Sequence, residues 1–166
     1  MPVVIGPGDG DRLPGAFGVQ VKVRSEFTGD AMAVIEETLP PGSVIPPHVH
    51  QNDVWVYVLS GQVAVLVGEE VAIAHRGGWA LKPRSVPHAM WNEGTEPAHI
   101  VEVLTPGGSE RWFEEVTRLA DDDTEGFRDA CERYGIQFFP DSPWIEAIRR
   151  RLDGQTGRTA ATGPPN

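Results

Sequence analysis

Three histidines in two separate stretches of the chain have the residue type and spacing of metal ligands. His48 and His50 are separated by one residue, and His88 follows a later turn. In an extended chain, residues i and i+2 project to the same face, so these two imidazoles can share one ion. His88 lies on a later strand and can face the first pair across a barrel. We therefore expect the three histidines to bind one divalent transition metal, and imidazole ligands do not distinguish Fe, Ni, Zn, Cu and Mn.

The elements that must position these histidines are short β-strands. The candidate strands are rich in β-branched and aromatic residues and are bounded by Gly, Pro, Asn and Ser. They are Gly18–Arg24, Ala31–Leu39, Val54–Leu59, Gln62–Val67, Val71–His75, Trp79–Lys82, Pro87–Trp91 and His99–Leu104. About eight strands at regular spacing, with no helix between them, predict an all-β antiparallel barrel or jelly roll.

The hydrophobic period changes after residue 108, which predicts a helical C-terminal extension. Ser109 can cap a helix over 110–120, and Thr124 can cap a second helix that ends at Gly135. Ser142-Pro143 is a good start for a third helix, because proline fits the first helical turn.

A chain of 166 residues suits one folded domain. We expect an N-terminal arm at 1–15, the barrel at 16–108, C-terminal helices packing on the barrel at 109–153, and a disordered tail at 154–166.

Composition excludes several classes of protein. The net charge of −10 argues against nucleic acid and anionic membranes as partners, because these need a basic surface. Cys131 is the only cysteine, so no disulfide can form within the chain. No apolar run approaches the length of a membrane helix, and the first residues lack the pattern of a signal peptide. The expected location is therefore the cytoplasm.

Two linked motifs resemble those of the cupin superfamily. The first is Gly42-x5-His48-x-His50-x3-Val54-x6-Gly61, and the second is Gly77-x5-Pro83-x-Ser85-x2-His88-x3-Asn92. The segments Tyr57–Gly61 and Thr105–Phe113 are similar to the monocupin branch related to quercetin 2,3-dioxygenases. The resemblance implies a cupin double-stranded β-helix, a jelly-roll barrel with its metal at the mouth.

The chain departs from this family at two motif positions. The usual metal-binding glutamate is replaced by Val54, and a glycine of the second motif is replaced by Ser85. Alternation along the strand places Asp53 on the opposite face, so Asp53 is a poor substitute for the glutamate. We therefore interpret the site as three histidines without a carboxylate, which leaves at least two or three coordination positions open.

The function expected from this site is metal-dependent chemistry on a small organic molecule. In quercetinase-like members the glutamate is thought to take the substrate's proton, so the same flavonol reaction is not implied here. Three-histidine cupins include dioxygenases, and we expect a dioxygenase that uses O2 on an enolate-, diol- or diketone-like substrate. The alternatives are a redox-neutral isomerase, cyclase or decarboxylase, and a non-catalytic small-molecule-binding protein.

The residues expected to line the pocket alternate with outward-facing ones. Val54, Val56, Val58 and Met90 should form an apolar wall beside the metal. His99 and Asn92 are candidates for hydrogen bonding behind the ligands, although a core or surface histidine and a turn-closing asparagine are the ordinary alternatives. Lys82 and Arg84 near the rim either attract an anionic substrate or are simply solvated.

Three aromatic residues, Trp55, Tyr57 and Trp91, are expected on the outer faces of the barrel. Exposed aromatic side chains indicate a covered surface. Either a homodimer forms through them, or the C-terminal helices cover them within one chain.

Overall fold

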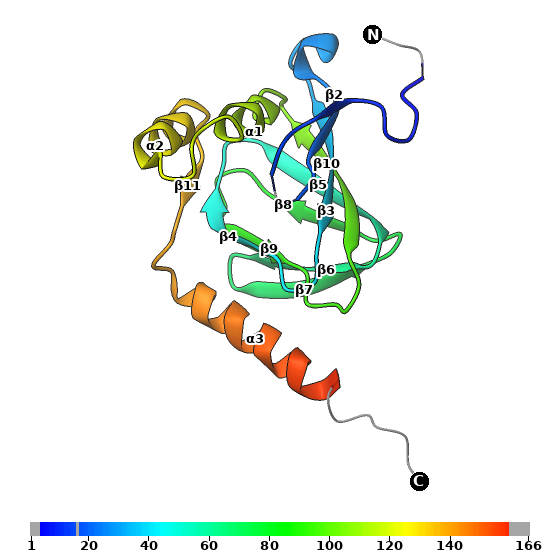
Figure 1. The fold of residues 1–166 in the computed structure, drawn as a ribbon, viewed down its shortest axis with the longest axis vertical. Coiled ribbons are helices and arrows are strands. Elements are labelled where there is room, and N and C mark those ends of the chain that lie inside the picture. The colour runs from blue at the N-terminus through cyan, green and yellow to red at the C-terminus, as the bar shows by residue number, and fades with distance from the viewer. Residues whose placement is uncertain (1–3, 16, 160–166) are drawn as a thin grey trace.

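The computed structural model describes residues 4–15 and 17–159, and its core is two facing antiparallel sheets (Figure 1). One sheet has the order β1-β2-β3-β10-β5-β8, with β1 at Asp11–Arg12, β2 at Gln20–Val23, β3 at Ala33–Leu39, β10 at Ala98–Thr105, β5 at Asp53–Ser60 and β8 at Trp79–Lys82. The other has the order β11-β4-β9-β6-β7, with β11 at Gln137–Phe138, β4 at Val44–Val49, β9 at His88–Trp91, β6 at Gln62–Val67 and β7 at Glu70–His75. This is the jelly roll that the strand pattern predicts.

Strict alternation of burial shows how the strands build the core. In β3 and β10 every second residue is buried, and in β5 the buried positions are Val54, Val56 and Val58. These side chains meet those of the opposite sheet, such as Val65 and Met90, in one hydrophobic cluster between the sheets. The eight expected strands are present with small differences at their ends, and their inward and outward faces follow the period of two.

Strand β4 was missing from the expected strands because Pro46 and Pro47 interrupt its pattern. Proline cannot donate to a sheet ladder, so it is tolerated where the pairing is irregular. The register of β4 on β9 shifts between Ile45 and His48, which is where the two prolines lie. The expected extended conformation of the segment that leads to His48 and His50 is nevertheless correct.

Three α-helices and one short 3₁₀ turn, η1 at Ser25–Thr28, complete the described part of the chain. Helix α1 covers Glu110–Val116, α2 covers Thr124–Arg133 and α3 covers Pro143–Thr159. Ser109 is the N-cap residue of α1, as expected, whereas the expected N-cap of α2 is off by one residue. The side chain of Ser109 makes no capping hydrogen bond, and Asp123, not Thr124, caps α2 by accepting from the Gly126 amide at 2.9 Å. Gly135 follows α2 with a φ of 65°, as expected of a residue after a helix end.

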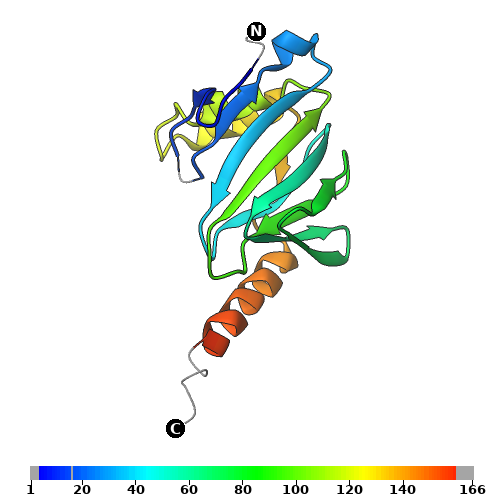
Figure 2. The same cartoon turned by 90° about the vertical axis from the view of Figure 1, so that its right-hand side faces the viewer.

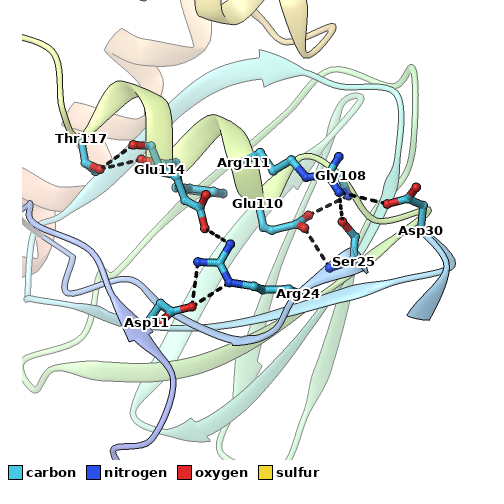
Figure 3. Close-up of polar contacts among 10 residues, drawn as sticks. Asp11, Arg24, Ser25, Asp30, Gly108, Glu110, Arg111, Glu114 and Thr117 are labelled. Atoms are coloured by element: carbon cyan, nitrogen blue, oxygen red, sulfur yellow. Dashed lines mark hydrogen bonds and ion pairs between the residues drawn. The ribbon is translucent and has the colours of Figure 1, made fainter. Parts of the chain in front are cut away.

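Polar contacts hold α1 against β2 and η1 (Figure 3). The buried carboxylate of Glu110 accepts from the backbone amides of Ser25 at 2.9 Å and Gly108 at 2.7 Å. Arg24 bridges the short N-terminal strand and α1 through ion pairs with Asp11 at 2.7 Å and Glu114 at 2.5 Å. The expected arm at 1–15 is thus partly a strand that pairs with β2, while residues 1–3 lie outside the described residues.

Helix α3 packs on the outer face of the five-stranded sheet through its first turns. Trp144, Ile148 and Leu152 contact a second apolar cluster that includes Trp91. Arg151 lies over the Trp91 ring and bonds both oxygens of Glu93 at 3.0 Å. Trp91 therefore points away from the core as expected but is fully buried, because α3 covers it.

The C-terminal end of α3 extends beyond the barrel (Figure 2). Residues 154–159 are helical, so the expected tail begins too early, and residues 160–166 lie outside the described residues. Among the described residues, none of the helices combines the length and apolar character needed to cross a membrane.

Candidate metal centre

The neighbouring strands β4 and β9 of the five-stranded sheet bring the histidines together, so His88 lies beside His48 in one sheet and does not face it across the barrel as expected. His48 on β4 is directly opposite His88 on β9, and His50 follows β4 on the same face as His48. All three side chains are buried, and one nitrogen from each lies within 4.8 Å of the others. Among the described residues, no carboxylate or thiol belongs to this group. The geometry therefore agrees with the expected three-histidine cluster.

Backbone carbonyl groups fix the orientation of all three rings. The Nδ1 atoms of His48, His50 and His88 lie 2.8 Å from the carbonyl oxygens of Pro46, Asn52 and Val86, respectively. A carbonyl oxygen only accepts, so each Nδ1 carries the hydrogen and each Nε2 presents a lone pair. This is the hydrogen-bonding arrangement that orients metal-binding histidines in proteins.

The inner nitrogen atoms of the three histidines are arranged to bind a cation. The Nε2 atoms of His48 and His88 are 3.1 Å apart, and with both hydrogens on Nδ1 their lone pairs face each other. The Nε2 atom of His50 is buried without a hydrogen-bond partner in the described part of the chain. Such an arrangement is unfavourable by itself and becomes favourable when a positive ion accepts the lone pairs. His48, His50 and His88 are therefore the residues that would hold the metal.

Burial keeps these histidines neutral and ready to bind a metal. Burial is the main cause that lowers the pKa of His48 to about 3 and of His50 to about 4, and the positive charge of Lys82 lowers both further. The pKa of His88 falls to about 2, mainly through burial and then through His48 and Lys82. Neutral imidazole is the form that coordinates metals.

His48 and His50 line a cavity of about 250 Å³. Apolar residues from both sheets, from α1 and from β11 line most of it, among them Phe17, Ile45, Val54, Trp112, Phe113 and Phe138. Phe138 pairs with His48 across β11 and β4 and stacks on its ring, with the ring centroids 5.3 Å apart. The α1 and β11 segments thus contribute part of the cavity lining.

Several expected site residues lie elsewhere. Of the expected apolar wall, Val54 lines the cavity, while Val56, Val58 and Met90 lie in the hydrophobic core between the sheets. His99 is exposed on β10, because its position alternates with the buried Ala98 and Ile100. Asn92 is buried away from the histidines and closes a turn, since its amide donates to Leu39 and Glu96 carbonyls at 2.9 and 2.8 Å.

Asp53 and Ser85 lie near the histidines but do not belong to the metal-binding group. Asp53 points away from the cavity and bonds the Arg84 guanidinium at 2.7 Å, so Arg84 holds the pKa of this carboxyl below its usual range. Asp53 therefore does not replace a missing metal-binding carboxylate. Ser85 has a φ of 60°, a left-handed conformation that glycine adopts most easily.

A buried charged cluster on the six-stranded sheet was not predicted from the sequence. Lys82, Glu37 and Glu102 all line the cavity, and none is more than 3% exposed. The Lys82 ammonium lies 2.6 Å from Glu102. Lys82 was expected near the rim, but its register opposite Val54 turns it inward. The available signal was an acidic residue flanked at i−2 and i+2 by aliphatic residues, as Ile35 and Leu39 flank Glu37.

The charge of Glu37 gives a prediction for the pH dependence of stability. Burial, followed by repulsion from Glu102, raises the pKa of Glu37 to about 8, from 4.5 for a free side chain. Between these values the folded protein holds a proton that the unfolded chain has released, so the free energy of unfolding falls as pH rises. We expect wild type to lose stability relative to Glu37→Gln from about pH 5 to 8, by at most about 1.4 kcal/mol per pH unit. Urea unfolding of both proteins across this range measures the difference, and parallel profiles would contradict it.

The fold and the convergent histidines define a jelly-roll protein with a candidate metal centre. Residues 35–104 match the family described as the cupin domain, and this segment contains all three histidines. The chain therefore has the cupin fold, as its two motifs led us to expect. No curated protein matches it in sequence.

Solved structures share the fold at low sequence identity. A predicted oxalate decarboxylase from Thermotoga maritima has a TM-score of 0.57 and 17% identity, over 63% of this chain and 99% of that chain. The polyketide cyclase RemF from Streptomyces resistomycificus has a TM-score of 0.54 and 19% identity, over 63% and 80%. The cupin domain of Cnp3 from Schizosaccharomyces pombe has a TM-score of 0.52 and 17% identity, over 79% and 80%. These similarities establish the cupin fold.

Proposed function

We propose that this chain is a metal-dependent enzyme, a dioxygenase that acts on a small enolate-, diol- or diketone-like molecule bound at His48, His50 and His88. The observation that carries the proposal is the convergence of three lone-pair nitrogens beside a mostly apolar cavity that His48 and His50 line. A chain that needed these histidines only for packing would satisfy their polar atoms within the protein.

The ligand set favours an anionic oxygen ligand. Three neutral imidazoles leave the full charge of a divalent ion, whereas a carboxylate would cancel part of it. When bound, the ion would act as a Lewis acid that polarises substrate oxygens. Phe17, Phe113 and Phe138 would exclude water from the apolar part of the substrate and so strengthen the polar interactions at the histidines.

The direct test combines metal content with oxygen consumption. We expect protein purified without added metal or chelator to contain about one transition-metal ion per chain by elemental analysis. With acetylacetone and catechol as probe substrates, the loaded protein should consume dissolved O2, and His50→Ala should not. Turnover of either probe under strict anaerobiosis would exclude the dioxygenase proposal.

A redox-neutral enzyme, such as an isomerase, cyclase or decarboxylase, is the second candidate. The observation that favours it is the buried Glu37 carboxyl in the same cavity, because a carboxyl in this environment can donate a proton near neutral pH. A non-catalytic binding protein is the remaining alternative. It predicts no stoichiometric metal and unchanged ligand binding in His50→Ala.

The absence of a metal-binding glutamate at position 54 gives a further prediction. Val54 lines the cavity that His48 and His50 also line. We expect Val54→Glu to add a fourth ligand and to change the relative affinities for zinc, nickel and iron, because a carboxylate is a harder ligand than imidazole. Competition with a chromophoric chelator measures the affinities, and Val54→Gln is the uncharged control. Identical affinities in Val54→Glu and wild type would show that residue 54 does not reach the ion.

The expected homodimer remains a prediction, for which the structure offers a candidate surface. Trp55 and Trp79 are 44% and 58% exposed, on the adjacent strands β5 and β8, and Val103 of β10 pairs with Trp55. Exposed apolar side chains that reach the edge strand β8 suit a second copy of the same sheet. We expect sedimentation equilibrium to give twice the 18.1 kDa chain mass, and Trp55→Arg/Trp79→Arg to give a monomer. A monomeric wild type would exclude the dimer.

A further inference from the structure

Unpartnered polar atoms gather in the cavity beyond the metal-binding group. Within the described residues, Glu37 Oε2, Asn52 Nδ2 and Ser109 Oγ are buried without a hydrogen-bond partner, as is His50 Nε2. All four residues line the same cavity. The large majority of buried side-chain polar atoms in proteins have a partner. These four atoms are therefore available to bond to a polar ligand in the cavity.

Glu37 differs from the other members of this group because it can exist with or without a charge. Lys82 is the ammonium of the buried cluster, and it lies 2.6 Å from Glu102. One cation therefore faces two carboxyl groups, and the pair that forms leaves Glu37 Oε2 without a partner. A buried, unpaired carboxylate is costly, so the second carboxyl is favoured as the neutral acid. As such it offers one O–H donor to the cavity.

The register of the strands fixes Glu37 on the side of the cavity opposite the metal-binding strands. Glu37 lies on β3 opposite Ile100 of β10, and Glu102 lies opposite both Ile35 of β3 and Val56 of β5. These inward positions belong to the six-stranded sheet, whereas His48 and His88 belong to the facing sheet. A ligand in the cavity can therefore be held from both sheets at once.

We propose that Glu37 is a ligand-binding residue, whose carboxyl donates a hydrogen bond to an acceptor oxygen of a small, apolar, ring-sized molecule. This inference rests on the proposed function and deepens it by naming the substrate class: a ketone or enol with one oxygen function at the histidines and another at Glu37. The size agrees, because an apolar cavity of about 150 Å³ binds benzene and this one is about 250 Å³. The Lys82–Glu102 ion pair acts as a positioning element, since it occupies the one ammonium that would otherwise pair with Glu37.

The test uses metal-free full-length protein and acetophenone, whose ring matches the apolar lining and whose carbonyl is an acceptor. Its carbonyl stretching frequency in the infrared falls when it accepts a hydrogen bond. We expect a bound acetophenone band at lower frequency in wild type, and no such shift in Glu37→Leu. Titration calorimetry should show binding about three- to tenfold weaker in Glu37→Leu, the usual effect of losing one hydrogen bond.

Two control variants separate a specific contact from a general disturbance. Glu37→Gln keeps a neutral donor of the same size and should retain most of the affinity. Glu36→Gln alters the neighbouring side chain, which is 38% exposed, and should leave both the band and the affinity unchanged. Equal affinity in wild type and Glu37→Leu, an unshifted carbonyl band, or no binding of acetophenone at all would overturn the inference.

These results are independent of the proposed metal site. Zinc binding is measured separately in wild type and Glu37→Leu, and we expect it to be unchanged because Glu37 is not in the histidine group. If zinc does not bind while the acetophenone band shifts, the proposed function fails and the Glu37 contact stands. If zinc binds and the band does not shift, the inference fails and the metal site stands.

Discussion

Replacing His50 with alanine is expected to abolish stoichiometric zinc binding. Loss of a hydrogen-bond partner behind a metal-binding histidine already costs ten- to a hundredfold in affinity, so losing the ligand itself should cost more than about a hundredfold. His50 is the best position for this test because it lies at the cavity and follows β4, whereas His88 is fully buried within a strand. Isothermal titration calorimetry with zinc gives the affinity directly.

A stability measurement provides a second readout for the same variant. Zinc at a hundred times its Kd should raise the free energy of unfolding of wild type by about 2.7 kcal/mol and that of His50→Ala by much less. His99→Ala is the matched control, because His99 is exposed on β10 and outside the histidine group. Equal zinc affinity in His50→Ala and wild type would remove the basis for the proposed function.

The positions of the three histidines could be predicted because they depend on local geometry. An extended chain fixes the relation of His48 to His50, and the second motif places His88 on a strand, β9, that pairs with β4 in the same sheet. The same period of two predicted that Val54, Val56 and Val58 face inward and Trp55 outward. Alternation gives the face of a residue but not its depth, which is why Val56 and Val58 lie in the core and not at the cavity.

The parts that could not be predicted depend on contacts between distant segments. Trp91 has the alternation of an outward residue, and only the docking of α3 shows that it is buried. Glu37 and Glu102 belong to strands 65 positions apart in sequence, yet the antiparallel register of β3 on β10 brings both to one cavity. From the sequence alone, each glutamate could be interpreted as a solvated surface charge, because Lys82, which compensates the charge, lies on a third strand.

Replacing Lys82 with methionine is expected to destabilise the metal-free protein by about 3 to 5 kcal/mol. Removing one partner of a buried ion pair leaves the other charge without compensation in a medium that solvates it poorly. Here the variant leaves two carboxyl groups, Glu37 and Glu102, in one cavity without a cation. Methionine has a similar length and fits an apolar wall, so the loss reports the charge and not a void. Urea unfolding in the presence of a chelator measures the difference without interference from bound metal.

The pH dependence and a double variant identify the cause of this loss. Without Lys82 no cation compensates the buried carboxyl groups, so folding disfavours their charged forms. The destabilisation should therefore be larger at about pH 8 than at about pH 5. Lys82→Met/Glu102→Leu should recover most of the loss, because an apolar pair can replace a buried ion pair.

Arg84→Met is the exposed counterpart and separates burial from the loss of an ion pair as such. Arg84 and Asp53 form an ion pair at 2.7 Å, with 53% and 30% of their side chains exposed. Pairs of this kind contribute at most about 1 kcal/mol, so Arg84→Met should cost far less than Lys82→Met. Similar losses in the two variants would mean that water reaches Lys82 and Glu102. The cavity would then lack the low polarity that keeps Glu37 neutral and makes its single O–H donor specific for a ligand oxygen.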